Sequence, residues 1–183
     1  MAEGESFVPN QEPKVQPLNP ISNWFMAIGL WGIFLTILNM FGKVHPNYHI
    51  SWGGLLTFEF TNKAFEPVSE GIQVTASDGV FGLVCIAMMY AAFKNINGSI
   101  GFSNWLRGLV INETWKSLGG GDEMQRTVAA WCVLLGLVFY LWYGIQYTAW
   151  IDVGVYSVSI ALVGFGLALI YSMNSPEGDL NVD

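Results

Sequence analysis

One long apolar stretch, from Thr127 to Met173, constrains this chain more than any other feature. Asp152 is the single charged residue inside it, and it divides the stretch into two halves. Each half is long enough to cross a hydrocarbon core of about 30 Å, which requires about 20 helical residues. The sequence therefore predicts two membrane spans joined by a tight turn at Asp152, which together form a helical hairpin.

The composition agrees with an integral membrane protein. Only 11% of the residues are charged, whereas a soluble domain usually contains about 25%. The net charge of −7 argues against nucleic acid as a partner, since nucleic acid attracts Lys and Arg. Cys85 and Cys132 lie in apolar runs without CxxC spacing, so we expect them to act as small hydrophobic residues.

Two further spans are expected before the hairpin. The first follows a candidate N-cap at Ser22 and ends before Gly42, which can adopt the left-handed conformation that terminates helices. Its Gly29 and Gly32 are small enough to allow close contact with another helix. The second has a short charge-free run and needs Val74 as its start to reach a full crossing; a re-entrant or tilted segment is the alternative. The predicted spans are about 22–41, 74–93, 127–150 and 153–173.

The fold class is therefore an all-α integral membrane protein with four transmembrane helices. Between the second and third spans, a segment from Phe102 to Leu118 places its apolar residues on one helical face, which predicts an amphipathic helix lying in the membrane interface. The apolar run in the loop from Lys43 to Gln73 is too short to cross a membrane. We therefore expect this loop to lie on the membrane surface or to pack as a partly buried lid.

The domain organisation follows from these spans. Residues 1–20 form a polar N-terminal tail, residues 21–174 a single membrane domain, and residues 175–183 an acidic C-terminal tail. With four spans, both termini and the second long connection share one side of the membrane. That side carries five of the seven basic residues, so the positive-inside rule predicts that both termini are cytoplasmic. The five are Lys14, Lys94, Arg107, Lys116 and Arg126.

The only two histidines, His45 and His49, lie in the first long loop. Neutral imidazole binds zinc and copper, and Glu59, Glu66 or Glu70 could complete a site. No third histidine and no H-E-x-x-H pattern is present. We therefore expect two solvated or carbonyl-bonded loop histidines and keep metal binding as the alternative.

Six aromatic residues are concentrated in the third span: Phe139, Tyr140, Trp142, Tyr143, Tyr147 and Trp150. Trp and Tyr near a span end are typical of the interfacial belt. The deeper residues Phe139, Trp142 and Tyr143 could instead line a groove for a lipid, a quinone or a pigment. Packing or belt positions are the expected role, because large rings contribute mainly apolar surface.

A stripe of small residues follows the fourth span: Ser157, Ala161, Gly164 and Ala168 are spaced four, three and four residues apart. This spacing puts them on one helical face, where another helix can approach closely. The partner is either the third span or a neighbouring subunit.

The sequence contains no nucleophile motif, phosphate-binding loop or dinucleotide fingerprint. We therefore expect a non-catalytic accessory subunit of a larger membrane complex, of a respiratory, photosynthetic or membrane-bound oxygenase kind, whose partners are membrane lipids and other membrane subunits. Two alternatives remain open: a homo-oligomeric channel or transporter for a small solute, and a metal- or pigment-binding subunit for electron transfer.

Overall fold

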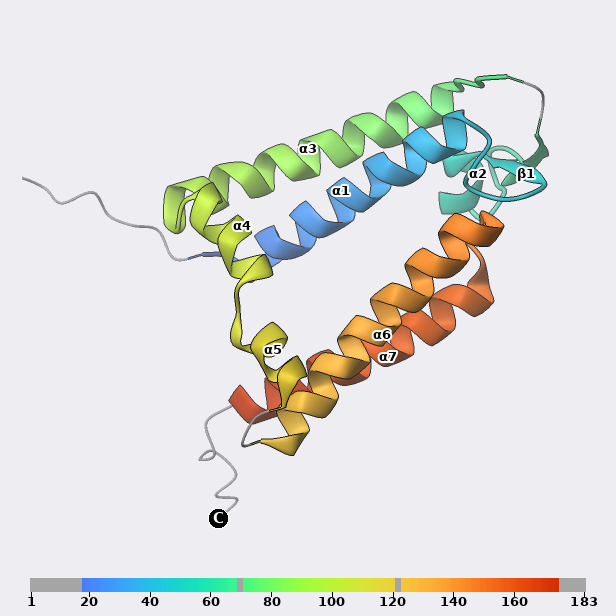
Figure 1. Cartoon of the computed structure of the whole chain (residues 1–183). Helices are drawn as coiled ribbons and strands as arrows, with labels where there is room; N and C mark the ends of the chain where they lie inside the picture. The colour runs from blue at the N-terminus through green and yellow to red at the C-terminus, as the bar shows by residue number, and fades with distance from the viewer. Residues whose placement is uncertain (1–17, 69–70, 121–122, 175–183) are drawn as a thin grey trace, which may run out of the picture.

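The computed structural model describes residues 18–68, 71–120 and 123–174. Most of them are helical (Figure 1). The predicted C-terminal tail and residues 1–17 of the predicted N-terminal tail lie outside the described residues.

Four helices are long and apolar enough to cross a membrane, which is compatible with a multi-pass membrane protein. Their bounds differ from the predicted spans by a few residues, and the largest difference is the extension of the second span past Lys94. The four are α1 (Pro20–Met40), α3 (Ala76–Ser99), α6 (Met124–Tyr147) and α7 (Val153–Asn174).

The ends of α1 follow ordinary capping chemistry, although the predicted N-cap is wrong. Asn19 caps the helix, since its side chain accepts a hydrogen bond from the Ile21 amide, and Pro20 occupies the first turn. The hydroxyl of Ser22 instead donates to Asn95 Oδ1 of α3 at 2.9 Å. At the other end, Gly42 adopts φ +62°, as the sequence predicts.

Helices α1 and α3 pack against each other as an antiparallel hairpin (Figure 1). The contact depends on Gly29 and Gly32, which are both buried. A Cβ atom on Gly29 would lie 2.5 Å from Met89 Cγ and 2.9 Å from the Cys85 carbonyl oxygen. The prediction that these glycines allow close helix contact is therefore confirmed.

Helices α6 and α7 form the second hairpin. Gly136 lies against the Ser159 carbonyl, and Gly166 lies against the Ala129 carbonyl, so the two backbones approach closely. Thr148 ends α6 in the left-handed region with φ 52°. Asp152 Oδ1 then accepts a hydrogen bond from Val155 N at 2.9 Å and so caps α7.

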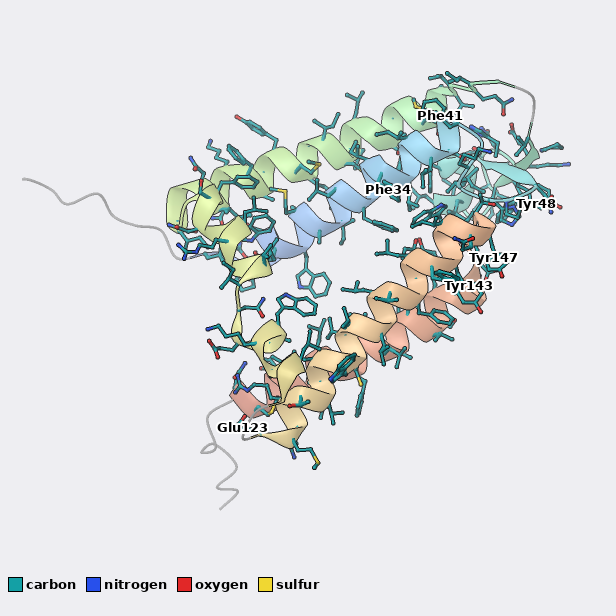
Figure 2. All side chains as sticks on the ribbon, viewed as in Figure 1. Phe34, Phe41, Tyr48, Glu123, Tyr143 and Tyr147 are labelled. Atoms are coloured by element: carbon teal, nitrogen blue, oxygen red, sulfur yellow. The ribbon has the colours of Figure 1, made fainter. Side chains whose placement is uncertain are left out.

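The two hairpins meet at one end and diverge toward the other (Figure 1). We call the meeting end the loop end, because the loop between α1 and α3 lies there. Trp150 is buried at this end, with its ring 5.0 Å from that of Phe34 and 6.0 Å from that of Trp31. Figure 2 shows Phe34 on the α6 side of α1. Trp150 therefore joins the hairpins, which agrees with packing, one of the two roles expected for these aromatic residues.

The loop between α1 and α3 has its own structure. It contains β1 (Tyr48–Ile50), the short helix α2 (Trp52–Leu56) and β2 (Phe65–Pro67), and the two strands pair antiparallel. Trp52 is buried and its ring stacks on that of Phe81, with centroids 4.5 Å apart. Of the two predicted arrangements, this packing fits the partly buried lid.

The connection between the hairpins begins with α4 (Phe102–Val110). A single helix was expected here, but the chain breaks at Ile111 and continues as α5 (Glu113–Lys116) and a 3-10 turn, η1 (Ser117–Gly119). Asn112 explains the break, because its side chain accepts from Trp115 N and caps α5. The ring N–H of Trp105 donates to Asn23 Oδ1 at 2.8 Å, which holds α4 against the start of α1.

We predict that Gly29→Ala destabilises the protein by about 1–3 kcal/mol, because the added methyl group meets backbone as well as side-chain atoms. Thermal unfolding of the full chain in mild detergent, followed by circular dichroism, measures the effect. Gly79→Ala is the matched control, since a Cβ there has no described heavy atom within 4 Å. Equal stability of the two variants would contradict this account of the α1–α3 contact.

Candidate functional site

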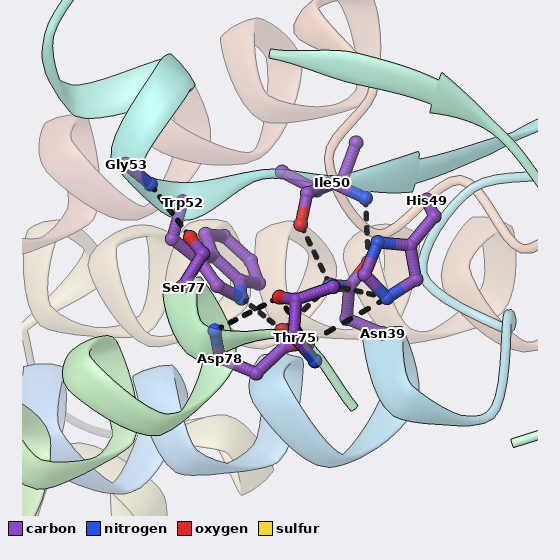
Figure 3. A network of polar contacts seen from close by, with 8 residues as sticks. All are labelled: Asn39, His49, Ile50, Trp52, Gly53, Thr75, Ser77 and Asp78. Carbon is purple, nitrogen blue, oxygen red and sulfur yellow. Dashed lines mark hydrogen bonds and ion pairs between the residues drawn. The ribbon is translucent and has the colours of Figure 1, made fainter. Parts of the chain in front are cut away.

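A buried polar cluster occupies the loop end of the α1–α3 hairpin (Figure 3). Its central side chains are Asn39 from α1, His49 from β1, Trp52 from α2 and Asp78 from α3. Each of them is at most 4% exposed. Polar side chains buried to this extent require hydrogen-bond partners, and this cluster supplies them internally.

Asp78 accepts hydrogen bonds at both carboxylate oxygens. Its Oδ1 accepts from Asn39 Nδ2 at 2.8 Å and from Trp52 Nε1 at 2.9 Å. Its Oδ2 accepts from the amide and the hydroxyl of Thr75, at 3.0 and 2.8 Å. Thr75 and Asp78 also form the capping box that begins α3, where the helix dipole favours a negative charge.

Asn39 connects the first helix to the loop. Its Oδ1 accepts from the Ile50 amide, and its Nδ2 donates to the Ile50 carbonyl, both at 2.8 Å. The His49 ring lies beside the same groups, with Nε2 3.2 Å from Asn39 Nδ2 and 3.6 Å from Asp78 Oδ2. These contacts fix β1 against the ends of both helices.

The chemistry of the cluster is that of an anchor. Its hydrogen bonds join three regions that are distant in sequence: the end of α1, the β1–α2 part of the loop and the start of α3. The carboxylate of Asp78 accepts from α1, from α2 and from the residue that caps α3. Buried networks of this kind fix a unique arrangement when every member is paired. We therefore infer that the cluster holds the lid, which is the loop between α1 and α3, against the ends of these two helices.

The two histidines considered as metal ligands, His45 and His49, lie in different surroundings. The expectation of a solvated or carbonyl-bonded loop histidine is wrong for His49, which is buried in the polar cluster beside Asn39 and Asp78. His45 is half-buried, and its Nδ1 accepts from the Asn47 amide at 3.1 Å. Within residues 18–68, 71–120 and 123–174, no group of three or more His, Cys, Asp or Glu side chains could hold a metal ion. Metal binding at His45 and His49 stays a prediction.

The aromatic residues proposed for a ligand groove lie along one side of α6. The rings of Phe139 and Tyr143 are 4.6 Å apart, and Trp142 is more than half exposed. Figure 2 shows Tyr143 and Tyr147 at the loop end of α6. A groove formed by Phe139, Trp142 and Tyr143 remains a prediction.

The small-residue stripe of α7 is exposed at Ser157, Ala161, Gly164 and Ala168. The side of α7 that contacts α6 is a different one, on which Val155, Ser159 and Gly166 are buried. Ser159 follows Ser157 by two residues, about half a helical turn, so the two sides are opposite. The stripe therefore faces away from α6, which was one of its two predicted partners.

A groove opens between the two hairpins, and we call it the inter-hairpin groove. It has a volume of about 300 Å³ and is almost entirely apolar. Residues from α1, α6 and α7 line it: Trp24, Trp31, Gly136, Leu137, Tyr140, Tyr156, Ser159, Ile160, Val163, Gly164 and Leu167. Size and lining are typical of sites for small apolar ligands.

No protein-family model, curated protein or solved structure matches this chain. Its functional interpretation therefore depends on the geometry described above.

Sequence reasoning missed the central residues of the buried polar cluster. Asn39, Trp52 and Asp78 were not among the candidate site residues. One signal was present: Thr75 and Asp78 have the spacing of a capping box, which marks the start of α3. The partners of Asp78 could not be deduced, because they come from α1 and α2.

We predict that Asp78→Asn destabilises the protein by about 2–3 kcal/mol, because an amide presents only one acceptor where the carboxylate presents two. This corresponds to a fall of about 5–10 °C in the unfolding temperature. Thermal unfolding in mild detergent is the measurement. Glu66→Gln, an exposed carboxylate in the same loop, should leave that temperature unchanged; an equal fall in both variants would show that the cluster is not the cause.

Proposed function

We propose that this chain is a non-catalytic accessory subunit of a larger membrane complex. The observation that carries the proposal is the exposed small-residue stripe of α7, which lies opposite the side that contacts α6. The proposal includes the expectation that the complex is respiratory, photosynthetic or a membrane-bound oxygenase, and the identity of the partner chains would test this.

The helix contacts within this chain are of the same kind as the contact proposed for the stripe. Its two hairpins are each held together where glycine lets helix backbones approach, at Gly29 and Gly32 in one and at Gly136 and Gly166 in the other. In a bilayer, helices associate through close packing, since lipid tails are as apolar as the side chains. The stripe of α7 is a further small-residue surface, and it has no partner among the described helices, so it suits a helix of another subunit.

The proposal places the chain as a multi-pass protein with α4 in the plane of the membrane interface. Leu106, Leu109 and Val110 of α4 are each at least half exposed, and Arg107 lies in its last turn. Such a helix buries its apolar residues among lipids and keeps its charge in the headgroup region. The distribution of Lys and Arg supports cytoplasmic termini, which puts the buried polar cluster on the opposite side.

We predict that Ala161→Leu, in the middle of the stripe, weakens association with the partner chains about tenfold, because a larger side chain separates the helices. The measurement is gentle detergent extraction of the tagged full chain from native membranes, followed by native mass determination and identification of co-migrating chains. Val158→Leu is the control, since Val158 is exposed on α7 outside the stripe.

Several different chains should accompany the wild type and the control but not Ala161→Leu. A particle that contains only copies of this chain would contradict the proposal and favour the homo-oligomeric channel. Unfolding temperatures of both variants should match the wild type, because Ala161 and Val158 are both exposed on α7.

A further inference from the structure

We propose that the turn after α2, residues 57–61, binds the lipid bilayer by inserting the rings of Phe58 and Phe60 into the membrane interface beside α3. We call this turn the aromatic tip. The inference rests on the four long helices crossing a bilayer. It is separate from the proposed assembly, because the aromatic tip belongs to the lid and not to α7.

The two rings of the aromatic tip are unusually exposed. Phe60 is 90% exposed and Phe58 87%, and no other large apolar side chain among the described residues is as exposed. Leu56, at the end of α2, is also exposed. Apolar surface gathered at one place in this way marks a contact with another apolar phase, since water is an unfavourable neighbour for it.

The backbone of the aromatic tip holds the rings outward. Phe58 and Glu59 have φ of 52° and 65°, a left-handed conformation that is rare for residues with large side chains. Two hydrogen bonds stabilise it: the Glu59 amide donates to the Gly54 carbonyl at 2.7 Å, and the Phe60 amide donates to the Thr57 carbonyl at 3.1 Å. The exposure of the rings is therefore a property of a defined turn.

The chain that returns from the aromatic tip is packed against α2. Glu59 Oε1 accepts a hydrogen bond from the Ala64 amide at 2.9 Å. A Cβ atom on Gly54 would lie 2.6 Å from the Asn62 carbonyl oxygen and 2.7 Å from that of Lys63. These contacts join the aromatic tip firmly to the lid, so a force that holds the rings also holds the lid.

Hydrogen bonds place the base of the aromatic tip beside the first turn of α3. The Gly53 amide donates to Ser77 Oγ at 2.8 Å (Figure 3). The Thr57 hydroxyl donates to the Gly53 carbonyl at 2.7 Å, and the Thr61 hydroxyl then donates to that of Thr57 at 2.9 Å. Both ends of the turn therefore lie close to Gly53 and to the start of α3.

The length of α3 gives the depth of this point in a bilayer. The helix has 24 residues and is about 36 Å long, whereas the hydrocarbon core is about 30 Å thick. When α3 is centred in the core, its first turn lies at the boundary between acyl chains and headgroups. Phenylalanine and leucine of interfacial segments are buried at this boundary. The lipid interface is therefore the apolar phase within reach of Phe58 and Phe60.

The charges of the aromatic tip indicate which part of the lipid it recognises. Glu59 is the single charged residue among residues 57–61, and Lys63 follows shortly after. Anionic headgroups are bound by clusters of Lys and Arg, and one opposed pair is not such a cluster. We therefore expect the aromatic tip to bind the apolar boundary of the bilayer regardless of headgroup charge.

The first test locates the rings by fluorine NMR of the full chain in lipid nanodiscs. A p-trifluoromethylphenylalanine replaces Phe58 or Phe60, one at a time, and Tyr90 as a lipid-facing reference, since it is exposed on α3. A lipid that carries a nitroxide near the top of its acyl chain should broaden the signals of both tip positions. A water-soluble gadolinium chelate should leave them sharp, in neutral and in anionic nanodiscs alike.

The second test measures whether the contact holds the lid. In the double variant Phe58→Ser/Phe60→Ser, we expect amide hydrogen exchange of the lid in nanodiscs to be about tenfold faster than in the wild type, because apolar burial no longer opposes opening. Ile72→Ser is the matched control, since Ile72 is an exposed apolar residue of the same loop outside the aromatic tip. It should exchange as the wild type does.

Three results would overturn the proposal. Broadening by the gadolinium chelate but not by the nitroxide lipid would place the rings in water. Broadening by neither would show that protein covers them, from a second copy or another chain. Equal exchange of the lid in the wild type and the double variant would show that the rings do not hold it. None of these results bears on assembly through α7, which the Ala161→Leu experiment tests.

Discussion

Close approach of helix backbones is the constraint on which the rest of this structure depends. Where helices are surrounded by lipid, apolar side chains gain nothing by leaving it, so packing at short distance has to hold them together. Gly29 lies against Cys85 and Met89 in the first hairpin, and Gly136 and Gly166 lie against the opposing helix in the second. The arrangement of the two hairpins, and the groove between them, follows from these contacts and from the aromatic residues around Trp150.

The buried polar cluster complements this packing at the loop end. Glycine contacts fix the distance between α1 and α3, but they leave the loop that joins the two helices undetermined. Asn39 and Asp78 provide what is missing, because they offer matched hydrogen-bonding groups to Ile50, Trp52 and Thr75. Each of these groups would be costly to bury alone, and together they specify one position of the lid.

The small-residue stripe and the inter-hairpin groove have only Gly164 of α7 in common. The small-residue stripe faces away from α6 and has the chemistry of a helix–helix contact. The inter-hairpin groove is lined by apolar and aromatic residues of α1, α6 and α7.

The sequence by itself determined that four helices are long and apolar enough to span a membrane, where they begin and end to within a few residues, and that Gly29 and Gly32 allow close contact. These properties are local, since they depend on the length of an apolar run, on capping residues and on side-chain size. Only the tertiary structure decided that Asn39, His49, Trp52 and Asp78 meet in one cluster, that Trp150 is buried, and that Ser159 lines a groove. Such properties depend on which face of each helix meets its neighbour, and the helices here are apolar on all sides, so no difference in hydrophobicity marks that face in the sequence.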